Sequence, residues 1–428
     1  MEVLISTIPD SVKRLISESS SVDDLRFTCS SLLNFFRNSL FFHQLVSDLT
    51  NLDTAALCRK NKEAAMETKA KGNECFDRGE YSGALRFYSQ ALRTAPNDAQ
   101  DKENNLVSTL YLNRSSTLHK LGLIQESLRD CNRALMSSPA YAKAWYRRGK
   151  INSSLGNSED AIRDFSVSLI IENSLAGKRQ IESELNLLSK QPVIRSNDIN
   201  KPNENSSDEN IQVELRCVSG EARGRGLVAS TDISPALLVH KEDPYAAIIS
   251  KPCRETHCAY CFNELPVDTV PCLSCSAPLY CSEKCRFQAG GEELPRFEDD
   301  DFGGSLRQLP TELLQHIRRN YVTSSGESSS DGEQFHEHRH ECRGMNWSSV
   351  LPSPLVLAGR ILVRNIEKRT HKSDGIPVNH SFYDLCQNYG RQPAERKLDF
   401  HFFSVVLLYC LHQFNPSRLP LDSAIASQ

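Results

Sequence analysis

The chain has 428 residues, which corresponds to about three domains of ordinary size. Lysine and arginine number 50 and aspartate and glutamate 54, so the net charge of −4 argues against direct nucleic-acid binding by the whole chain. An apolar fraction of 39% and a charged fraction of 24% are ordinary for a protein with buried cores. The best apolar run, 402–411, is about half of what spans a bilayer, and the N-terminus lacks a secretory-signal pattern. We therefore expect a cytoplasmic or nuclear protein without a membrane segment.

An internal repeat dominates 63–188 and follows a segment, 1–62, whose leucines and phenylalanines recur at helical spacing. Small residues and a proline recur with spacings of 12, 7 and 5 in two copies and of 12 and 7 in a third: Gly72, Ala84, Ala91 and Pro96; Ser115, Ser127, Ala134 and Pro139; Gly149, Ala161 and Ser168. The copies are offset by 43 and then 34 residues, and the extra nine residues form a polar stretch at 97–105. This pattern resembles tetratricopeptide repeats. It predicts helical hairpins over about 65–98, 108–141 and 142–175, with a capping helix ending near 188.

The remaining segments change character several times. Residues 189–210 are polar and are predicted to form a linker. From 211 the apolar period becomes two, which predicts a strand over 212–217, with further short strands at 227–230, 236–240 and 246–249. Residues 286–335 form an acidic, Ser- and Gly-rich insertion with one short helix near 312–319. Helices are expected again at 355–368 and 396–414.

Cysteine spacing indicates a metal site. Seven of the 15 cysteines lie between Cys258 and Cys342, which favours metal binding in a reducing compartment over a disulfide scaffold. Four pairs have C-x2-C, C-x3-C or H-x3-C spacing: Cys258 and Cys261, Cys272 and Cys275, Cys281 and Cys285, His338 and Cys342. Such pairs suit tetrahedral Zn²⁺, and eight ligands predict two structural ions that are closed to water. His336 and His340 compete with His338, although neither lies four residues before Cys342. The four-residue spacing places His338 and Cys342 on one face of a helix.

The order of these ligands, with Tyr280 directly before Cys281, resembles the MYND zinc finger. The resemblance implies interleaved sites over 253–345: one ion is held by Cys258, Cys261, Cys281 and Cys285, the other by Cys272, Cys275, His338 and Cys342. The 52 residues between Cys285 and His338 depart from the compact family pattern. A long loop is tolerated because its closure entropy grows only slowly with length.

A Gly-rich turn, GEARGRGLVASTDI at 220–233, precedes the finger and opens a short apolar strand. Together with the repeats and the finger it resembles the SET and MYND domain-containing protein methyltransferases, over about 63–428. The resemblance implies that Gly224, Arg225 and Gly226 lie against S-adenosylmethionine, where glycine permits close approach. It also implies a multidomain α+β fold. An α-helical tetratricopeptide solenoid would be followed by a partial SET β-fold (211–252) with the inserted finger, and by a C-terminal helical segment (346–428).

The catalytic half of that family's SET domain has no clear counterpart. Asn379, His380 and Ser381 begin like its Asn-His-Ser-Cys-x-Pro-Asn strand, but neither the cysteine nor Pro-Asn follows. The chain therefore looks like a family member that stops inside the helical insertion, and its catalytic residues are unknown. One hypothesis is a lysine methyltransferase that uses S-adenosylmethionine, active if the chain continues beyond Gln428 or the partial domain suffices. We expect instead a non-catalytic adaptor that binds this cofactor weakly or not at all.

Five polar residues of the first helices of the repeats suit an anionic peptide: Lys69, Asn73, Asn113, Lys143 and Arg147. First helices line the concave face of such a solenoid, so three cations and two amides can converge on a terminal carboxylate and an acidic side chain. The alternative is a set of solvated groove residues. The constellation resembles the dicarboxylate clamp of co-chaperones, which implies binding of the Glu-Glu-Val-Asp tails of the seventy- and ninety-kilodalton heat-shock chaperones. We expect the finger to bind a protein peptide.

Overall fold

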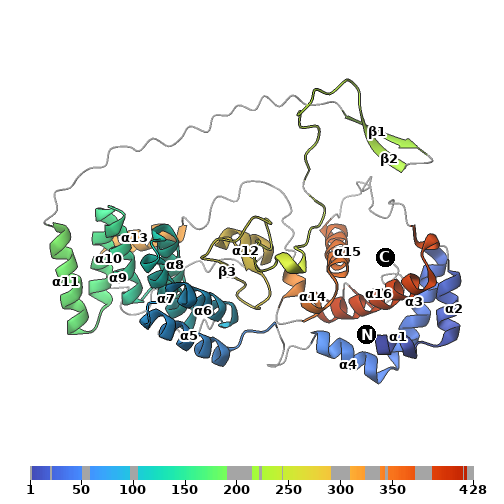
Figure 1. Ribbon diagram of the computed structural model, residues 1–428, viewed down its shortest axis with the longest axis horizontal. Coiled ribbons are helices and arrows are strands. Elements are labelled where there is room, and N and C mark those ends of the chain that lie inside the picture. Colours follow the sequence, from blue (N-terminus) through green and yellow to red (C-terminus); the bar gives the residue numbers. More distant parts are fainter. Residues whose placement is uncertain are drawn as a thin grey trace.

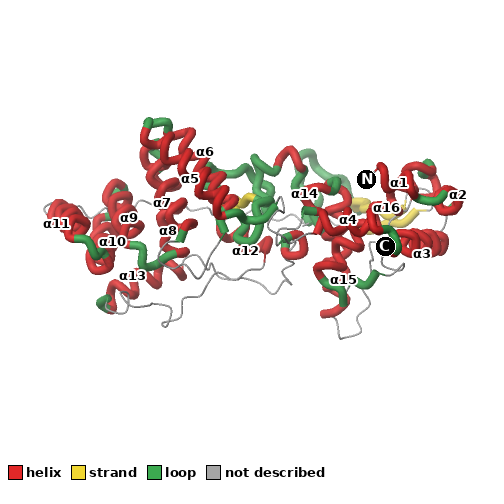
Figure 2. The backbone as a smooth tube through the Cα atoms, turned by 90° about the horizontal axis from the view of Figure 1, so that it is seen from below, coloured by secondary structure: helices red, strands yellow, loops and turns green. Residues whose placement is uncertain are grey.

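The computed structural model describes residues 2–19, 22–50, 58–96, 105–189, 215–220, 224–242, 244–290, 309–322, 338–342, 346–371, 388–417 and 419–421. Almost all of the predicted linker, most of the acidic insertion, and Asn379, His380 and Ser381 lie outside these residues. Two helical assemblies flank a small unit with short strands (Figure 1). The view from below keeps the same order, so the arrangement is elongated (Figure 2).

The first assembly is the predicted solenoid. Its helices are α5 (Lys62–Asp77), α6 (Tyr81–Thr94), α7 (Leu106–Lys120), α8 (Ile124–Ser137), α9 (Ala142–Ser154), α10 (Ser158–Ile171) and α11 (Leu175–Ser189). The small residues of the repeat allow close packing within each hairpin: a Cβ on Gly72 would lie 2.7 Å from the Tyr88 ring, and one on Gly149 would lie 2.8 Å from the Phe165 ring. The predicted tetratricopeptide-like architecture is thus confirmed.

Three glycines make the turns between paired helices of this solenoid. Gly79, Gly122 and Gly156 have φ values of 78°, 79° and 78° and lie two residues after the ends of α5, α7 and α9. A positive φ is strained for residues with a Cβ, so glycine is the suitable residue at this turn. The glycines are 43 and 34 residues apart, the same offsets as the rest of the repeat.

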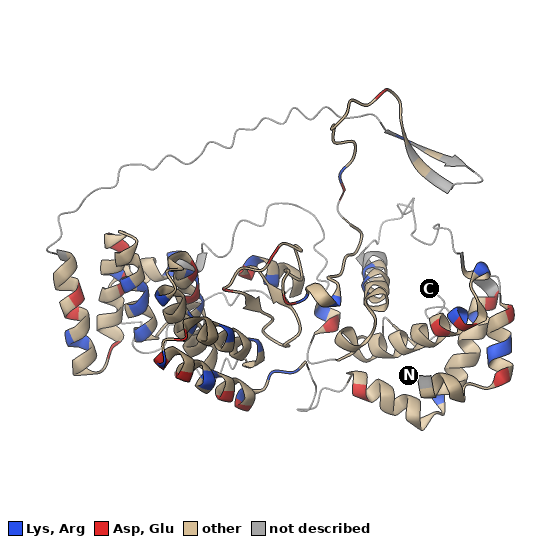
Figure 3. Ribbon diagram, in the orientation of Figure 1, with Lys and Arg blue, Asp and Glu red and all other residues tan. Residues whose placement is uncertain are grey.

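The second assembly joins the two ends of the described chain. It contains α1 (Glu2–Thr7), α2 (Asp10–Glu18), α3 (Val22–Arg37), α4 (Leu40–Thr50), α14 (Trp347–Val350), α15 (Ser353–His371), the short turn η6 (Asn388–Arg391) and α16 (Ala394–Phe414). Helix α16 contacts α2, α3 and α4, and the rings of Phe36 and Phe402 meet edge-on at 5.7 Å in a shared core. Figure 3 shows the long uncharged stretch of α16 that this core covers.

Strands are few in the described residues, and the partial SET β-fold is not confirmed. β1 (Leu215–Gly220) pairs antiparallel with β2 (Gly224–Ala229), with Leu215 opposite Ala229, which agrees with the first two strand predictions. The predicted strands at 236–240 and 246–249 are wrong. The reason why a strand does not form is clear for the second segment. There the backbone carbonyls of Tyr245 and Ala247 accept hydrogen bonds from Arg364 and Arg360 of α15 rather than from a neighbouring strand.

The finger lies between the two assemblies (Figure 1). It contains the turn η1 (Lys251–Cys253), β3 (Val270–Pro271) paired with β4 (Leu279–Tyr280), α12 (Glu283–Gly290) and the turn η4 (Arg339–Glu341). The predicted short helix of the insertion is α13 (Thr311–Val322), which packs on the solenoid. No helix among the described residues combines the length and the apolar character needed to cross a membrane.

Candidate functional site

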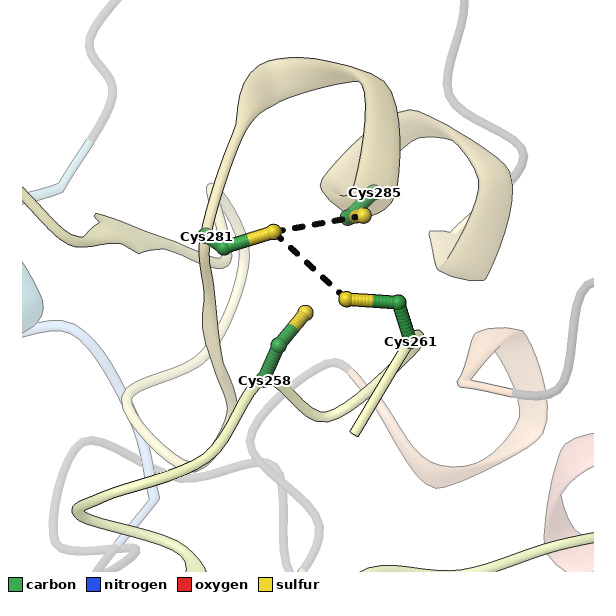
Figure 4. Close-up of side chains that lie close together, drawn as sticks. All are labelled: Cys258, Cys261, Cys281 and Cys285. Carbon is green, nitrogen blue, oxygen red and sulfur yellow. Dashed lines mark hydrogen bonds between the residues drawn. The ribbon is translucent and has the colours of Figure 1, made fainter. Parts of the chain in front are cut away.

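The first ligand set gathers at one end of the finger. Cys258 and Cys261 lie on a turn after η1, Cys281 follows β4, and Cys285 lies on α12. Their four sulfur atoms lie within 4.8 Å of one another and point to a common centre (Figure 4). Sγ of Cys281 is 3.6 Å from Sγ of Cys261 and 3.5 Å from Sγ of Cys285. Zn–S bonds of about 2.3 Å in a tetrahedron separate sulfurs by about 3.8 Å, so the set fits a zinc ion.

The second ligand set is more deeply buried. Cys272, Cys275, His338 and Cys342 bring one ligand atom each within 4.8 Å of the others, and all four are buried. Nε2 of His338 is 3.3 Å from Sγ of Cys275, and the sulfurs of Cys272 and Cys342 are 3.5 Å apart. The turn between His338 and Cys342 is the 3-10 turn η4 rather than the expected α-helical face.

Thiol chemistry agrees with metal ligation at both sets. Hydrogen bonding from Cys285 lowers the pKa of Cys258 to about 4. Hydrogen bonds from Cys275 and Cys342 hold the pKa of Cys272 well below its usual value. Crowded sulfurs therefore stabilise a thiolate in each set, and the thiolate is the form that binds zinc.

A buried carboxylate supports the second set. Oε2 of Glu341 lies 4.0 Å from Nδ1 of His338, on the opposite side of the ring from the ligand atom. Burial alone would raise the pKa of Glu341, but Arg360 of α15 donates to its carboxylate and holds the pKa far below the usual range. A carboxylate behind a histidine fixes the orientation of the ring for the metal. Sequence reasoning missed both Glu341 and Arg360.

Of the two competing histidines, His340 joins neither set. His340 stacks on Trp347 with ring centroids 6.1 Å apart, and burial lowers its pKa to about 4. His336 lies outside the described residues. Among the described residues, the structure thus selects His338.

Arginines of the solenoid form hydrogen bonds and salt bridges with the finger. Arg129 and Arg133 of α8 both bind the buried carboxylate of Asp268, at 2.8 Å. Arg93 of α6 donates to the carbonyls of Ser276 and Ala277, and Arg114 of α7 to that of Thr269. Burial alone would raise the pKa of Asp268, but Arg129 and Arg133 hold it below the usual value. These contacts fix the finger against the solenoid.

An Arg–Asp ion pair recurs in two repeats, and sequence reasoning missed it. One copy lies where the solenoid meets the finger and the other where it meets α13. Arg114 pairs with Asp130, and Arg148 pairs with Asp164, in equivalent positions 34 residues apart. Arg114 reaches the finger, whereas the Arg148–Asp164 pair meets His316 of α13, whose Nε2 lies 2.7 Å from Asp164. The recurrence of Arg-x15-Asp at the repeat offset was the available sequence signal.

The five predicted clamp residues lie on α5, α7 and α9. Nδ2 of Asn113 donates to Oδ1 of Asn73 at 3.2 Å, and the Tyr88 hydroxyl donates to the same oxygen at 2.7 Å. This bond links repeat two to repeat one. Lys143 and Arg147 are exposed and Lys69 is half-buried. None of these three cations forms a salt bridge with any residue in the described part of the chain.

The three predicted cofactor residues lie in the β1–β2 hairpin. Gly224, Arg225 and Gly226 open β2, and they face Gly220, Ser219 and Val218 of β1. A Cβ on Gly226 would have no described atom within 4 Å. No described residue therefore packs against this glycine, and the role of the three residues stays a prediction.

The solenoid and the two ligand sets define a tetratricopeptide-like protein with a cysteine-rich finger of zinc-site geometry. The profile of the family "Tetratricopeptide repeat" matches residues 142–166. The mouse "Protein-lysine N-methyltransferase SMYD4" is 27% identical over 343 residues, which are 71% of this chain and 41% of that protein. The chain thus spans less than half the length of this curated relative. The predicted resemblance to SET and MYND methyltransferases with tetratricopeptide repeats is confirmed.

Two further proteins are similar to shorter stretches of the chain. The human "Mitochondrial import receptor subunit TOM70" is 31% identical over 118 residues, 28% of this chain and 19% of that protein. A solved structure described as "First TPR of Spaghetti (RPAP3) bound to HSP90 peptide SRMEEVD" is 27% identical and covers 31% of this chain and 94% of that chain, with a TM-score of 0.27.

Proposed function

We propose that this chain is a protein-interaction adaptor whose solenoid binds acidic C-terminal peptides and whose finger is held together by two structural zinc ions. The observation that supports it best is the set of groove cations. On the outer helices, arginines such as Arg133 and Arg163 are paired with carboxylates. In the groove, Lys69, Lys143 and Arg147 form no salt bridge within the described residues. Cations without a salt bridge, beside two amides, suit a ligand that brings two carboxylates, although Lys143 also interacts electrostatically with Glu172.

The chemistry of the ligand follows from the donors. Lysine and arginine donate charge-assisted hydrogen bonds to carboxylates, and the amides of Asn73 and Asn113 can donate to a terminal carboxylate oxygen. A chain that ends in an acidic residue supplies two carboxylates on that one residue: the terminal carboxylate and the side-chain carboxylate. The Glu-Glu-Val-Asp tails of heat-shock chaperones have this chemistry, and they are the partners that we propose.

A peptide ending in Glu-Glu-Val-Asp should therefore bind the full chain, and amidation of its C-terminus should weaken binding by at least tenfold, because the amide removes one of the two carboxylates. Fluorescence anisotropy with labelled free and amidated peptides measures the difference. Equal affinities would show that the groove does not recognise a terminal carboxylate.

The finger contributes structure to this function. Each proposed zinc ion would have four protein ligands, which leaves no position for a reacting water. One ion would be bound by Cys258, Cys261, Cys281 and Cys285. The other would be bound by Cys272, Cys275, His338 and Cys342. We propose that the finger also binds a protein peptide and that the protein works in the cytoplasm or nucleus, since zinc thiolates require reduced cysteines.

Protein-lysine methylation is the second candidate, and the 71% of this chain that aligns with a named methyltransferase favours it. S-adenosylmethionine would supply the methyl group, and Gly224, Arg225 and Gly226 would lie against it. We expect the chain to bind this cofactor weakly or not at all, because one Gly-rich turn supplies only part of a pocket and catalysis needs the reacting amine positioned in line. Calorimetry that gives a micromolar dissociation constant would favour the enzyme over the adaptor.

A further inference from the structure

Tyr88 of α6 reaches between α5 and α7 to two of the predicted clamp residues. Its hydroxyl donates to Oδ1 of Asn73 on α5 at 2.7 Å, and Nδ2 of Asn113 on α7 donates to the same oxygen at 3.2 Å. An amide oxygen has two lone pairs, and both are used here. The oxygen of Asn73 is therefore saturated, and its amide nitrogen, which carries two N–H donors, is left for a ligand.

The ring of Tyr88 is held in place by close packing. Tyr88 is 2% exposed, and a Cβ on Gly72 would lie 2.7 Å from its ring. Since Gly72 directly precedes Asn73, this contact fixes the hydroxyl beside the amide. Burial raises the pKa of Tyr88 to about 12, so the hydroxyl keeps its proton at neutral pH and remains a donor.

The other repeats carry no hydroxyl at the equivalent position. The residue 16 positions after the first small residue of each repeat is Tyr88 in repeat one, Cys131 in repeat two and Phe165 in repeat three. A Cβ on Gly149 would lie 2.8 Å from the Phe165 ring, so a phenyl ring without a hydroxyl packs equally closely. The hydroxyl of repeat one thus adds polar contacts that the packing of the helices does not require.

We propose that the Tyr88 hydroxyl is a positioning and specificity-determining group of the peptide clamp: it holds Asn73 with its N–H donors toward the ligand, so that the clamp accepts a terminal carboxylate and discriminates against a terminal amide. A carboxylate only accepts hydrogen bonds, whereas an amide also presents N–H donors, which oppose those of Asn73. The proposal rests on the proposed function, because the same groove must hold the terminal carboxylate.

Tyr88→Phe should fold, because repeat three carries phenylalanine at this position. The variant loses one of the two hydrogen bonds to Oδ1 of Asn73, so the Asn73 amide can turn and present its oxygen to the ligand. That oxygen repels a carboxylate but accepts a hydrogen bond from a terminal amide. The preference for the free peptide over the amidated peptide should therefore fall by about three- to tenfold, the range of one hydrogen bond.

The experiment measures the dissociation constants of free and amidated Glu-Glu-Val-Asp peptides by anisotropy, for the full chain and its variants. Tyr88→Phe removes the hydroxyl and keeps the ring. Tyr146→Phe is the matched control, since its hydroxyl is bonded to Glu184 and Gln180 of α11 rather than to the clamp. Asn73→Ala, alone and combined with Tyr88→Phe, tests whether the hydroxyl acts through Asn73.

The readout is the ratio of the amidated to the free dissociation constant, because a variant that merely loosens the fold weakens both peptides alike. We expect Tyr88→Phe to lower this ratio, Tyr146→Phe to leave it unchanged, and Tyr88→Phe to have no further effect in the Asn73→Ala background. An unchanged ratio in Tyr88→Phe, or an equal fall in the Asn73→Ala background, would overturn the proposal while leaving the clamp intact. A wild type that binds neither peptide, or both equally, would overturn the proposed function as well.

Discussion

Replacing Cys272 by serine should reduce the zinc content of the purified chain from two ions per molecule to one and unfold the second half of the finger. Serine is a poor zinc ligand, and the binding energy of a structural zinc, about 10–16 kcal/mol, is folding energy for the segment that holds it. Metal analysis by mass spectrometry gives the stoichiometry. Hydrogen exchange should show lost protection in β3, β4 and η4.

The matched control is Cys253→Ser, since Cys253 is a half-exposed free cysteine five residues before the first ligand. This variant should keep both zinc ions. Two zinc ions in Cys272→Ser, or none in freshly purified and reduced wild type, would contradict the two-site assignment.

Replacing Arg147 by alanine should weaken binding of an acidic C-terminal peptide by about 2–4 kcal/mol, because it leaves a partly desolvated carboxylate without a partner. Since each 1.4 kcal/mol corresponds to a factor of ten, the dissociation constant should rise roughly 30- to 700-fold. Anisotropy at low salt measures the change, and added salt should reduce the difference between the two proteins.

Arg163→Ala is the control for this substitution. Arg163 lies on α10 of the same repeat and pairs with Glu159 and Asp160, so it belongs to the outer helix rather than to the groove. Its loss should leave peptide affinity unchanged. Equal affinity of the wild type and Arg147→Ala would rule out the clamp.

Local patterns explain what the sequence could predict. Helices of a repeat pack on their neighbours in sequence, so the spacing of Gly72, Ala84 and Ala91 is enough to predict where the paired helices approach closely. The cysteine pairs are equally local, because a C-x2-C turn places two sulfurs together before any other contact forms. The interleaving of the pairs came from resemblance, and the structure brings together the same two sets of four.

Long-range contacts explain the rest. The apolar period of 236–240 and 246–249 suggested strands, but a strand needs a neighbouring strand. At the second segment, Arg360 donates a hydrogen bond to the carbonyl of Ala247 and Arg364 to that of Tyr245 instead. The docking of α13 on Asp164 depends on a contact across 152 residues. No periodicity within 286–335 could indicate which surface that helix would meet.

The assembly built from both ends of the described chain sets an order of events during synthesis. Lys397 of α16 donates to the carbonyls of Ser17 and Ser19, and His401 meets Thr28, across 380, 378 and 373 residues. At about 5–20 residues per second, a ribosome needs roughly 20–75 s to add that length of chain. Each solenoid hairpin can close within seconds of emerging, whereas the apolar surface of α2, α3 and α4 that contacts α16 stays uncovered until α16 has left the exit tunnel. Helices α2 to α4 are thus open to aggregation during synthesis for longer than the hairpins of the solenoid.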